Sequence, residues 1–141
     1  MAETLRETGG PDVPSVRVLT VDDHAMFREV ARALIDATPG FEALGEAASG
    51  EEALELCEAL RPDLVLLDIN LPGIDGLETG RRLSHRRKAP VIVLISADPD
   101  PALREVATQL GASVFVSKAA LSARALREIW SVHGSRAAAA G

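Results

Sequence analysis

The residues with the clearest chemical potential stand where short apolar segments end. The run Leu64–Leu67 stops at a carboxylate, Asp68, and a loop rich in proline, glycine and aspartate follows. Other apolar runs lead into a carboxylate pair, Asp22-Asp23, into a hydroxyl, Ser96, and into an ammonium group, Lys118. If these segments lie side by side, carboxylates, a hydroxyl and an amine meet at one place.

Strand-like apolar runs alternate with helical patterns along the chain, and this alternation predicts the fold class. Apolar strands separated by single helices form a parallel sheet that is covered on both faces. Because crossovers are right-handed, we expect an α/β fold with a doubly wound sheet of five strands. The expected strands are Val16–Val21, a weaker one at Phe41–Ala47, Leu64–Leu67, Val91–Ile95 and Val114–Val116.

Helical patterns fill the intervals between these strands. The first has apolar residues at Met26, Val30, Leu34 and Ile35, a spacing that predicts one core-facing side. The second opens with Ser49-Gly50-Glu51-Glu52, which fits a capping box. The remaining helices are expected at Gly76–His85, at Pro101–Leu110 before Gly111, and at Ser122–Val132.

Ligands of open α/β sheets bind beside the carboxyl ends of the strands, where the polar residues above are expected. Carboxylates brought together repel one another, so Asp22, Asp23 and Asp68 require positive charge. Lys118 supplies one charge, and an all-oxygen site suits Mg²⁺. Phosphoryl transfer depends mainly on positioning and charge stabilisation, so this set, with Ser96, is sufficient to make Asp68 a phosphoryl acceptor.

Composition and missing motifs narrow the function classes. The net charge of −6 argues against a nucleic-acid or anionic-membrane surface. Cys57, the one cysteine, cannot form an internal disulfide, and no apolar run is long enough to cross a bilayer, so we expect a cytoplasmic protein. The sequence shows no phosphate-binding loop, nucleophile elbow or His-Glu-x-x-His motif. A site that accepts phosphate but activates water poorly suits a switch.

The chain divides into one folded unit and two polar ends. Residues 1–14 are expected to form a disordered leader and residues 15–133 the folded domain. Residues 134–141 are expected to form a flexible tail, although their alanines would alternatively extend the last helix.

At the residues described above, the sequence closely resembles the receiver domain of bacterial two-component response regulators. The matching segments are VLTVDDH, PDLVLLDINLPGIDG, PVIVLISA and GASVFVSK, in the order and spacing of that family. The segments VDDHAMFRE and DINLPGIDGLE are most similar to those of the NarL-type branch, whose members carry a LuxR-type helix-turn-helix. The resemblance implies a flavodoxin-like (βα)5 fold with the strand order 2-1-3-4-5.

The resemblance also implies an acceptor and a metal site. Asp68 would accept the phosphoryl group, and Asp23 and Asp68 would bind Mg²⁺ directly. The main-chain carbonyl of Asn70 would be a third protein ligand, and Asp22 would act through water.

Three further residues receive roles from the same resemblance. Lys118 would pair with the phosphoryl group, Ser96 would move toward it, and Phe115 would be the aromatic switch that turns inward. Simpler interpretations exist for two of them, because Ser96 could bond the local backbone and Phe115 could be a fixed core ring.

Partners are implied by resemblance alone. Members of the family receive the phosphoryl group from a histidine kinase or a phosphotransfer protein, and use the face of the fourth and fifth helices for partners or homodimerisation. The chain itself is expected to bind no nucleic acid and no membrane. Ala119 departs from the family's usual proline after the lysine and changes the expected shape of the next loop. A stand-alone receiver and a part of a DNA-binding regulator both fit the sequence.

Two other function classes stay open. An aspartyl-phosphate hydrolase or phosphotransferase would normally carry a second aspartate two residues after the nucleophile, where this chain has Asn70. A phosphate-independent interaction module would use the fold without the switch. We expect a phospho-accepting signalling domain that supports its own phosphorylation and slow dephosphorylation, rather than an enzyme.

Several residues have plain structural explanations beside functional ones. His24 is expected at a helix start rather than as a metal ligand, and Asp75 is expected either to help form the loop or to cap the third helix. The run His85-Arg86-Arg87-Lys88 could be a docking patch, but cations are favourable at a helix C-terminus. Trp130 could belong to the core or to a contact face.

Overall fold

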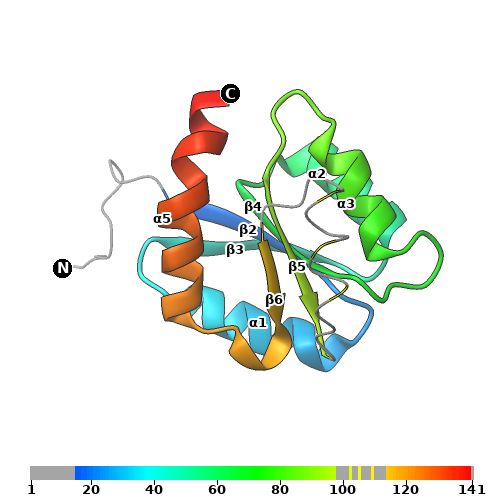
Figure 1. The fold of residues 1–141 in the computed structure, drawn as a ribbon. Helices are drawn as coiled ribbons and strands as arrows, with labels where there is room; N and C mark the ends of the chain where they lie inside the picture. The colour runs from blue at the N-terminus through cyan, green and yellow to red at the C-terminus, as the bar shows by residue number, and fades with distance from the viewer. Residues whose placement is uncertain (1–14, 98–101, 103–104, 106–108, 110–113, 141) are drawn as a thin grey trace.

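Five parallel strands form one sheet in the order β3-β2-β4-β5-β6 (Figure 1). This is the predicted order 2-1-3-4-5, and the doubly wound α/β fold is confirmed. The computed structural model describes residues 15–97, 102, 105, 109 and 114–140, with side chains as far as residue 134. The strands are β2 (Val16–Val21), β3 (Phe41–Ala47), β4 (Leu64–Asp68), β5 (Val91–Ser96) and β6 (Val114–Ser117).

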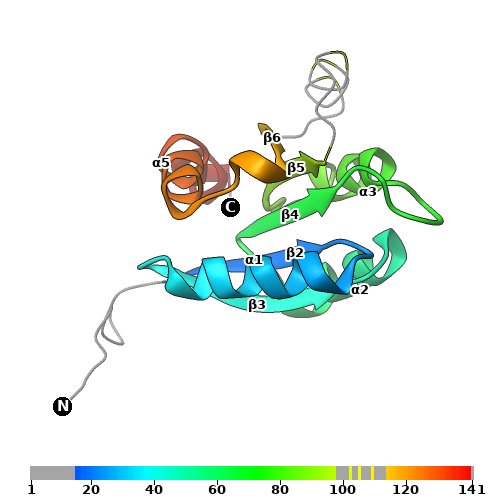
Figure 2. The ribbon, with the colours of Figure 1, turned by 90° about the horizontal axis from the view of Figure 1, so that it is seen from below.

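Helices cover both faces of the sheet. One face carries α1 (Ala25–Ala37) and α5 (Ala123–Ala140), and the other carries α2 (Gly50–Leu60) and α3 (Gly76–Ser84) (Figures 1 and 2). A short 3-10 helix, η1 (Lys118–Ala120), follows β6 directly. The central strands β2, β4 and β5 are therefore buried between helices, which explains their apolar runs in the sequence, whereas the edge strands β3 and β6 are only partly buried.

Alternate residues of each central strand enter two different cores. In β4, Leu67 packs with the residues of α2 and α3, whereas Leu66 packs with those of α1 and α5. In β5, Leu94 belongs to the first core, and Val93 and Ile95 belong to the second. This alternation follows from the two-residue period of a strand and fixes which face each strand presents.

The predicted apolar face of α1 is confirmed at Leu34 and Ile35 and is wrong at Met26 and Val30. Met26 and Val30 were expected in the core, but they are 78% and 59% exposed. The buried residues are Ala31 and Ile35, with Phe27 and Leu34 packed partly against the same core. Positions 27, 31, 34 and 35 also have helical spacing, and these are the positions that pack against the sheet.

The predicted helix starts at α2 and α3 are confirmed. Ser49 Oγ accepts a bond of 3.1 Å from the Glu52 N–H, and Asp75 Oδ1 accepts one of 2.8 Å from the Glu78 N–H. Helix α5 runs past the expected end at Val132 to Ala140, so the alanines continue the helix.

Some expectations fall beyond the described residues. The fourth helix predicted at Pro101–Leu110, its stop at Gly111 and the leader at 1–14 lie outside them, apart from single positions in the helix segment. Within the described ranges, no helix is both long and apolar enough to cross a membrane.

Candidate functional site

The carboxyl ends of four strands bring the predicted site residues to one edge of the sheet. Asp22 and Asp23 follow β2, Asp68 is the last residue of β4, and Ser96 is the last residue of β5. Lys118 begins η1 directly after β6. Residues distant in sequence meet because parallel strands all end on the same side.

Lys118 lies between two buried carboxylates. Its Nζ is 2.5 Å from Asp22 Oδ2 and 3.3 Å from Asp68 Oδ2. The side chains of Asp22 and Asp68 are 0% and 3% exposed, and that of Lys118 is 16% exposed. A shared ammonium compensates charges that burial would otherwise make unfavourable.

The two buried carboxyls have opposite pKa shifts. Burial alone would raise the pKa of Asp22, but Lys118 and the bonds from His24 outweigh it and hold this pKa below its ordinary value. Burial raises the pKa of Asp68, and the charge of Asp22 raises it further, against the opposing effects of the Asn70 N–H and Lys118. Asp22 is therefore the firmly ionised partner, and Asp68 carries the less stable negative charge.

The pKa of Lys118 shifts upward in the same cluster. Burial would lower this pKa, but the bonds and charges of Asp22 and Asp68 raise it above the ordinary value for lysine. The ammonium is consequently protonated throughout the physiological range.

The carboxylates form a donor set that fits a hard cation. Ligand atoms of Asp22, Asp23, His24 and Asp68 all lie within 4.8 Å of one another. Three of these four residues offer carboxylate oxygen, the donor that Mg²⁺ prefers. His24 is the N-cap residue of α1, as expected, and its Nδ1 lies 2.9 Å from Asp22 Oδ1.

The loop after β4 holds the Asp68 carboxylate. The N–H of Asn70, an exposed residue, donates a bond of 2.9 Å to Asp68 Oδ1. The loop then returns to the strand, where the Gly76 N–H donates to the Ile69 carbonyl at 3.1 Å. A Cβ at Gly76 would lie 2.4 Å from Ile69 Cα and closer still to the Asp68 carbonyl, so only glycine permits this approach.

Two residues at the site escaped the sequence prediction. Phe27 was not assigned a role, yet Lys118 Nζ lies 4.5 Å from the centre of its ring, a cation–π distance. Arg28 donates a bond of 2.7 Å from its guanidinium to the main-chain carbonyl of Asp22. The segment VDDHAMFRE, already prominent for its similarity to one family branch, contains both residues.

The remaining predicted residues lie at or near the same edge. Ser96 is buried and pairs in register with Ser117 of β6. Phe115 is half-buried in β6 and packs against the core on the α2 and α3 side. Ala119 is exposed within η1, whose turn is capped by a bond of 3.2 Å from the Ala120 N–H to Ser117 Oγ.

Comparison with known proteins identifies the family of the chain. The model of the response regulator receiver domain matches residues 18–130 of the chain. The response regulator UvrY of Escherichia coli is 32% identical over 121 residues, covering 86% of this chain and 56% of UvrY. NarL of Escherichia coli is 44% identical over 79 residues, covering 56% of this chain and 37% of NarL.

A third relative carries the name of an enzyme. A protein-glutamate methylesterase/protein-glutamine glutaminase of Alkalilimnicola ehrlichii is 38% identical over 104 residues, covering 73% of this chain and 27% of that protein. The chain thus spans 27% to 56% of the lengths of these curated relatives.

Solved structures agree with this assignment. The receiver domain of a NarL from Mycobacterium tuberculosis superposes with a TM-score of 0.75 at 34% identity, covering 88% of this chain and 97% of that one. A LuxR-family response regulator from Aurantimonas gives a TM-score of 0.76 at 33% identity, covering 84% of each chain. With the family model matching most of its length, the chain belongs to the response regulator receiver domain family of two-component signal transduction.

Proposed function

We propose that Asp68 accepts a phosphoryl group from the phosphohistidine of a histidine kinase or phosphotransfer protein. An oxygen of the Asp68 carboxylate forms a bond to phosphorus while the bond from phosphorus to the donor nitrogen breaks. The nitrogen keeps the electron pair and takes up a proton. The observation that carries the proposal is the buried Asp68 carboxylate, held 3.3 Å from the Lys118 ammonium at the ligand-binding edge of the sheet.

The surrounding residues have distinct tasks in this proposal. Lys118 balances the charge of Asp68 before the reaction and attracts the phosphoryl oxygens afterward. The raised pKa of Asp68 marks a carboxylate whose negative charge is disfavoured by burial and by the charge of Asp22, and a bound cation would relieve this. Asp22, Asp23, Asp68 and the Asn70 carbonyl would hold Mg²⁺, which when bound stabilises the charge on the transferring group.

A surface for the donor protein is available beside this site. Met26 and Val30 are exposed on α1, which begins two residues after Asp23. Two apolar side chains one helical turn apart suit a contact with a partner helix. Replacing both by glutamate should slow transfer from phosphorylated kinases of the same organism while labelling by acetyl phosphate, a donor without a docking surface, stays unchanged.

Ser96 and Phe115 would carry the signal away from Asp68. We assign Ser96 to contact with the phosphoryl group and Phe115 to the change of partner-binding surface, with homodimerisation by the face of the fourth and fifth helices as one output. The half-buried position of Phe115 leaves its ring room to change burial. Sedimentation with and without beryllofluoride and Mg²⁺, in wild type and Phe115→Leu, tests this assignment.

Labelling with small phosphodonors tests the acceptor chemistry. The protein is incubated with acetyl phosphate or phosphoramidate, with Mg²⁺ or with chelator, and its intact mass is measured. We expect one Mg²⁺-dependent phosphoryl adduct, absent in Asp68→Asn and present in Asp36→Asn, a matched change on the exposed side of α1. Labelling of Asp68→Asn would contradict the proposal, and multiple turnover of a phosphate ester would favour a hydrolase instead.

A further inference from the structure

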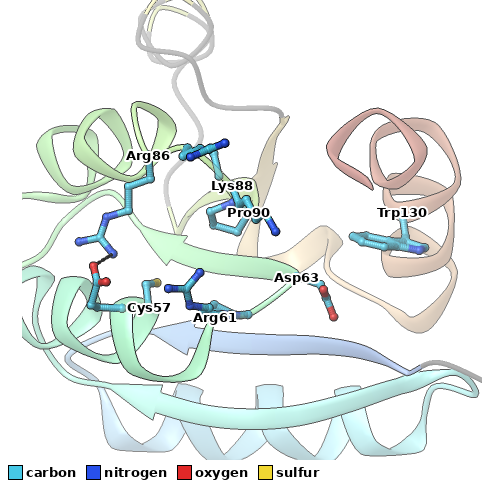
Figure 3. A pocket seen from close by; sticks show the side chains of 11 residues that line it. Cys57, Arg61, Asp63, Arg86, Lys88, Pro90 and Trp130 are labelled. Carbon is cyan, nitrogen blue, oxygen red and sulfur yellow. Dashed lines mark ion pairs between the residues drawn. The ribbon is translucent and has the colours of Figure 1, made fainter. Parts of the chain in front are cut away.

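A groove lies at the edge of the sheet opposite the Asp68 site. It is formed by the end of α2, the loop into β4, the loop from α3 into β5, and α5 (Figure 3). Its volume is about 870 Å³, within the size range of ligand sites. The residues lining this basic groove are Cys57, Glu58, Arg61, Pro62, Asp63, Arg86, Arg87, Lys88, Ala89, Pro90 and Trp130.

The charge of the basic groove is opposite to that of the chain. Four cationic side chains and two carboxylates line it, whereas the whole protein has a net charge of −6. Arg86 is engaged, because it pairs with Glu58 at 3.4 Å. The other three cations, Arg61, Arg87 and Lys88, are exposed, and none has an ion pair within the described part of the chain. Their charge is available to a ligand.

The walls of the basic groove are fixed by hydrogen bonds from a neighbouring strand. The guanidinium of Arg17 donates to the carbonyls of Leu60 and Arg61 at 2.6 and 2.8 Å. The N–H of Arg17 donates to Asp63 Oδ2 at 2.8 Å, so this carboxylate is already partly satisfied. The loop that carries Arg61 is thus held in place before any ligand arrives.

An aromatic surface closes the basic groove on the side of α5. Trp130 extends toward the side of Asp63 and Pro90 (Figure 3) and packs partly against the core. A Cβ at Gly134 would lie 2.5 Å from the indole ring, so the ring lies flat against the helix backbone at this glycine. Trp130, Pro62 and Pro90 thus add apolar surface to a groove that is also lined by cations.

We propose that the basic groove binds an acidic peptide segment of a partner protein, at a site separate from the phosphorylation edge. Cations beside aromatic and proline surfaces match a segment in which Asp or Glu alternates with apolar side chains. Nucleic acid fits less well, because a long polyanion would extend beyond the groove over a protein with a net charge of −6, whereas a short acidic peptide contacts the groove alone. Small phosphates fit less well, because they would leave the apolar surfaces of Trp130, Pro62 and Pro90 without a contact.

Trp130 provides the measurement, since it is the one tryptophan of the chain. The probe is an acetylated peptide of repeated Glu-Glu-Leu, with Gln-Gln-Leu as its uncharged counterpart. We expect saturable change of Trp130 fluorescence with the acidic peptide, weakened by salt, and much weaker binding of the counterpart.

Two variants separate local charge from net charge. Arg87→Glu with Lys88→Glu should raise the dissociation constant about tenfold or more. Arg124→Glu with Arg127→Glu changes net charge equally on the exposed face of α5 and should leave binding nearly unchanged. Gly134→Ala displaces the indole without altering charge and should also weaken binding.

Three outcomes would overturn the proposal. These are equal binding of both peptides, equal loss in the two charge-reversed variants, or tighter binding of adenosine triphosphate or single-stranded DNA than of the acidic peptide. Labelling by acetyl phosphate is measured in every variant and should stay at the wild-type level. The proposal for the groove and the proposal for the acceptor site are therefore tested independently of each other.

Discussion

At the scale of single residues, burial and charge compete around Asp22, Asp68 and Lys118. Burial acts against every charge in the cluster, and the Lys118 ammonium compensates Asp22 more fully than Asp68. The residue proposed to react is thus the one whose negative charge is least stabilised by the fold. Folding and function make opposite demands on this carboxylate.

Removing the charge of Asp68 should stabilise the metal-free protein. Because folding raises the pKa of Asp68, its contribution to stability is present below the ordinary pKa and is lost as pH rises through the folded value. Asp68→Asn should therefore be more stable than wild type at neutral pH, by the order of 1 kcal/mol. The difference should close as pH falls below about 4.

Urea unfolding in the presence of chelator measures this difference, with Asp36→Asn as control. Added Mg²⁺ should stabilise wild type more than Asp68→Asn. A variant that is less stable than wild type at neutral pH would show that the Lys118 pair outweighs burial.

Phe27 should act as a positioning residue for Lys118. Phe27→Leu keeps apolar volume but removes the ring 4.5 Å from Lys118 Nζ. We expect labelling by acetyl phosphate to slow about fivefold, the equivalent of about 1 kcal/mol, with no loss of fold. Phe27→Tyr retains a ring and should restore the rate. Equal rates in wild type and Phe27→Leu would exclude this role.

At the scale of elements, sequence pattern predicted strands better than helix faces. The runs of the central strands β4 and β5 were recognisable because both of their faces are buried, so the apolar run itself marks the element. In α1, two sets of apolar residues share helical spacing, and only contact with the sheet decides between them. Met26 and Val30 were assigned to the core for this reason, although they face solvent.

A matched pair of substitutions tests the corrected face of α1. Ile35 is fully buried, so Ile35→Ala should lower the free energy of unfolding by about 3 kcal/mol. Val30 is 59% exposed, and Val30→Ala should change the free energy of unfolding by less than about 0.5 kcal/mol. Denaturant unfolding measures both, and a similar cost for the two variants would contradict the observed packing.

At the scale of the whole molecule, parallel topology made the reactive site predictable. Asp22, Asp68 and Lys118 could be placed together from sequence because every strand end falls on one edge. The stacking of Phe27 on Lys118 and the basic groove depend on how helices and loops pack across the sheet. Local sequence patterns do not determine that packing, so these two features could be identified only from the structure.

The thiol of Cys57 reports on the core between the sheet and α2. Burial raises its pKa to about 11 from 9.0, so the folded protein holds the thiol proton more tightly than the unfolded chain. This contribution to stability is complete below pH 9 and is lost between 9 and about 11. Relative to Cys57→Ala, wild type should therefore lose about 2 to 3 kcal/mol across that window. The free energy of unfolding of both proteins is measured across this pH range, and a difference that stays constant would contradict the prediction.

Locating the phosphoryl group on the chain tests directly whether Asp68 is the acceptor. The protein is labelled with acetyl phosphate and Mg²⁺, reduced with borohydride, which converts an aspartyl phosphate to homoserine, and then digested and sequenced by mass spectrometry. We predict homoserine at position 68 alone, and none in unlabelled protein. Homoserine at position 22 or 23, or no modified aspartate in labelled protein, would contradict Asp68 as the acceptor.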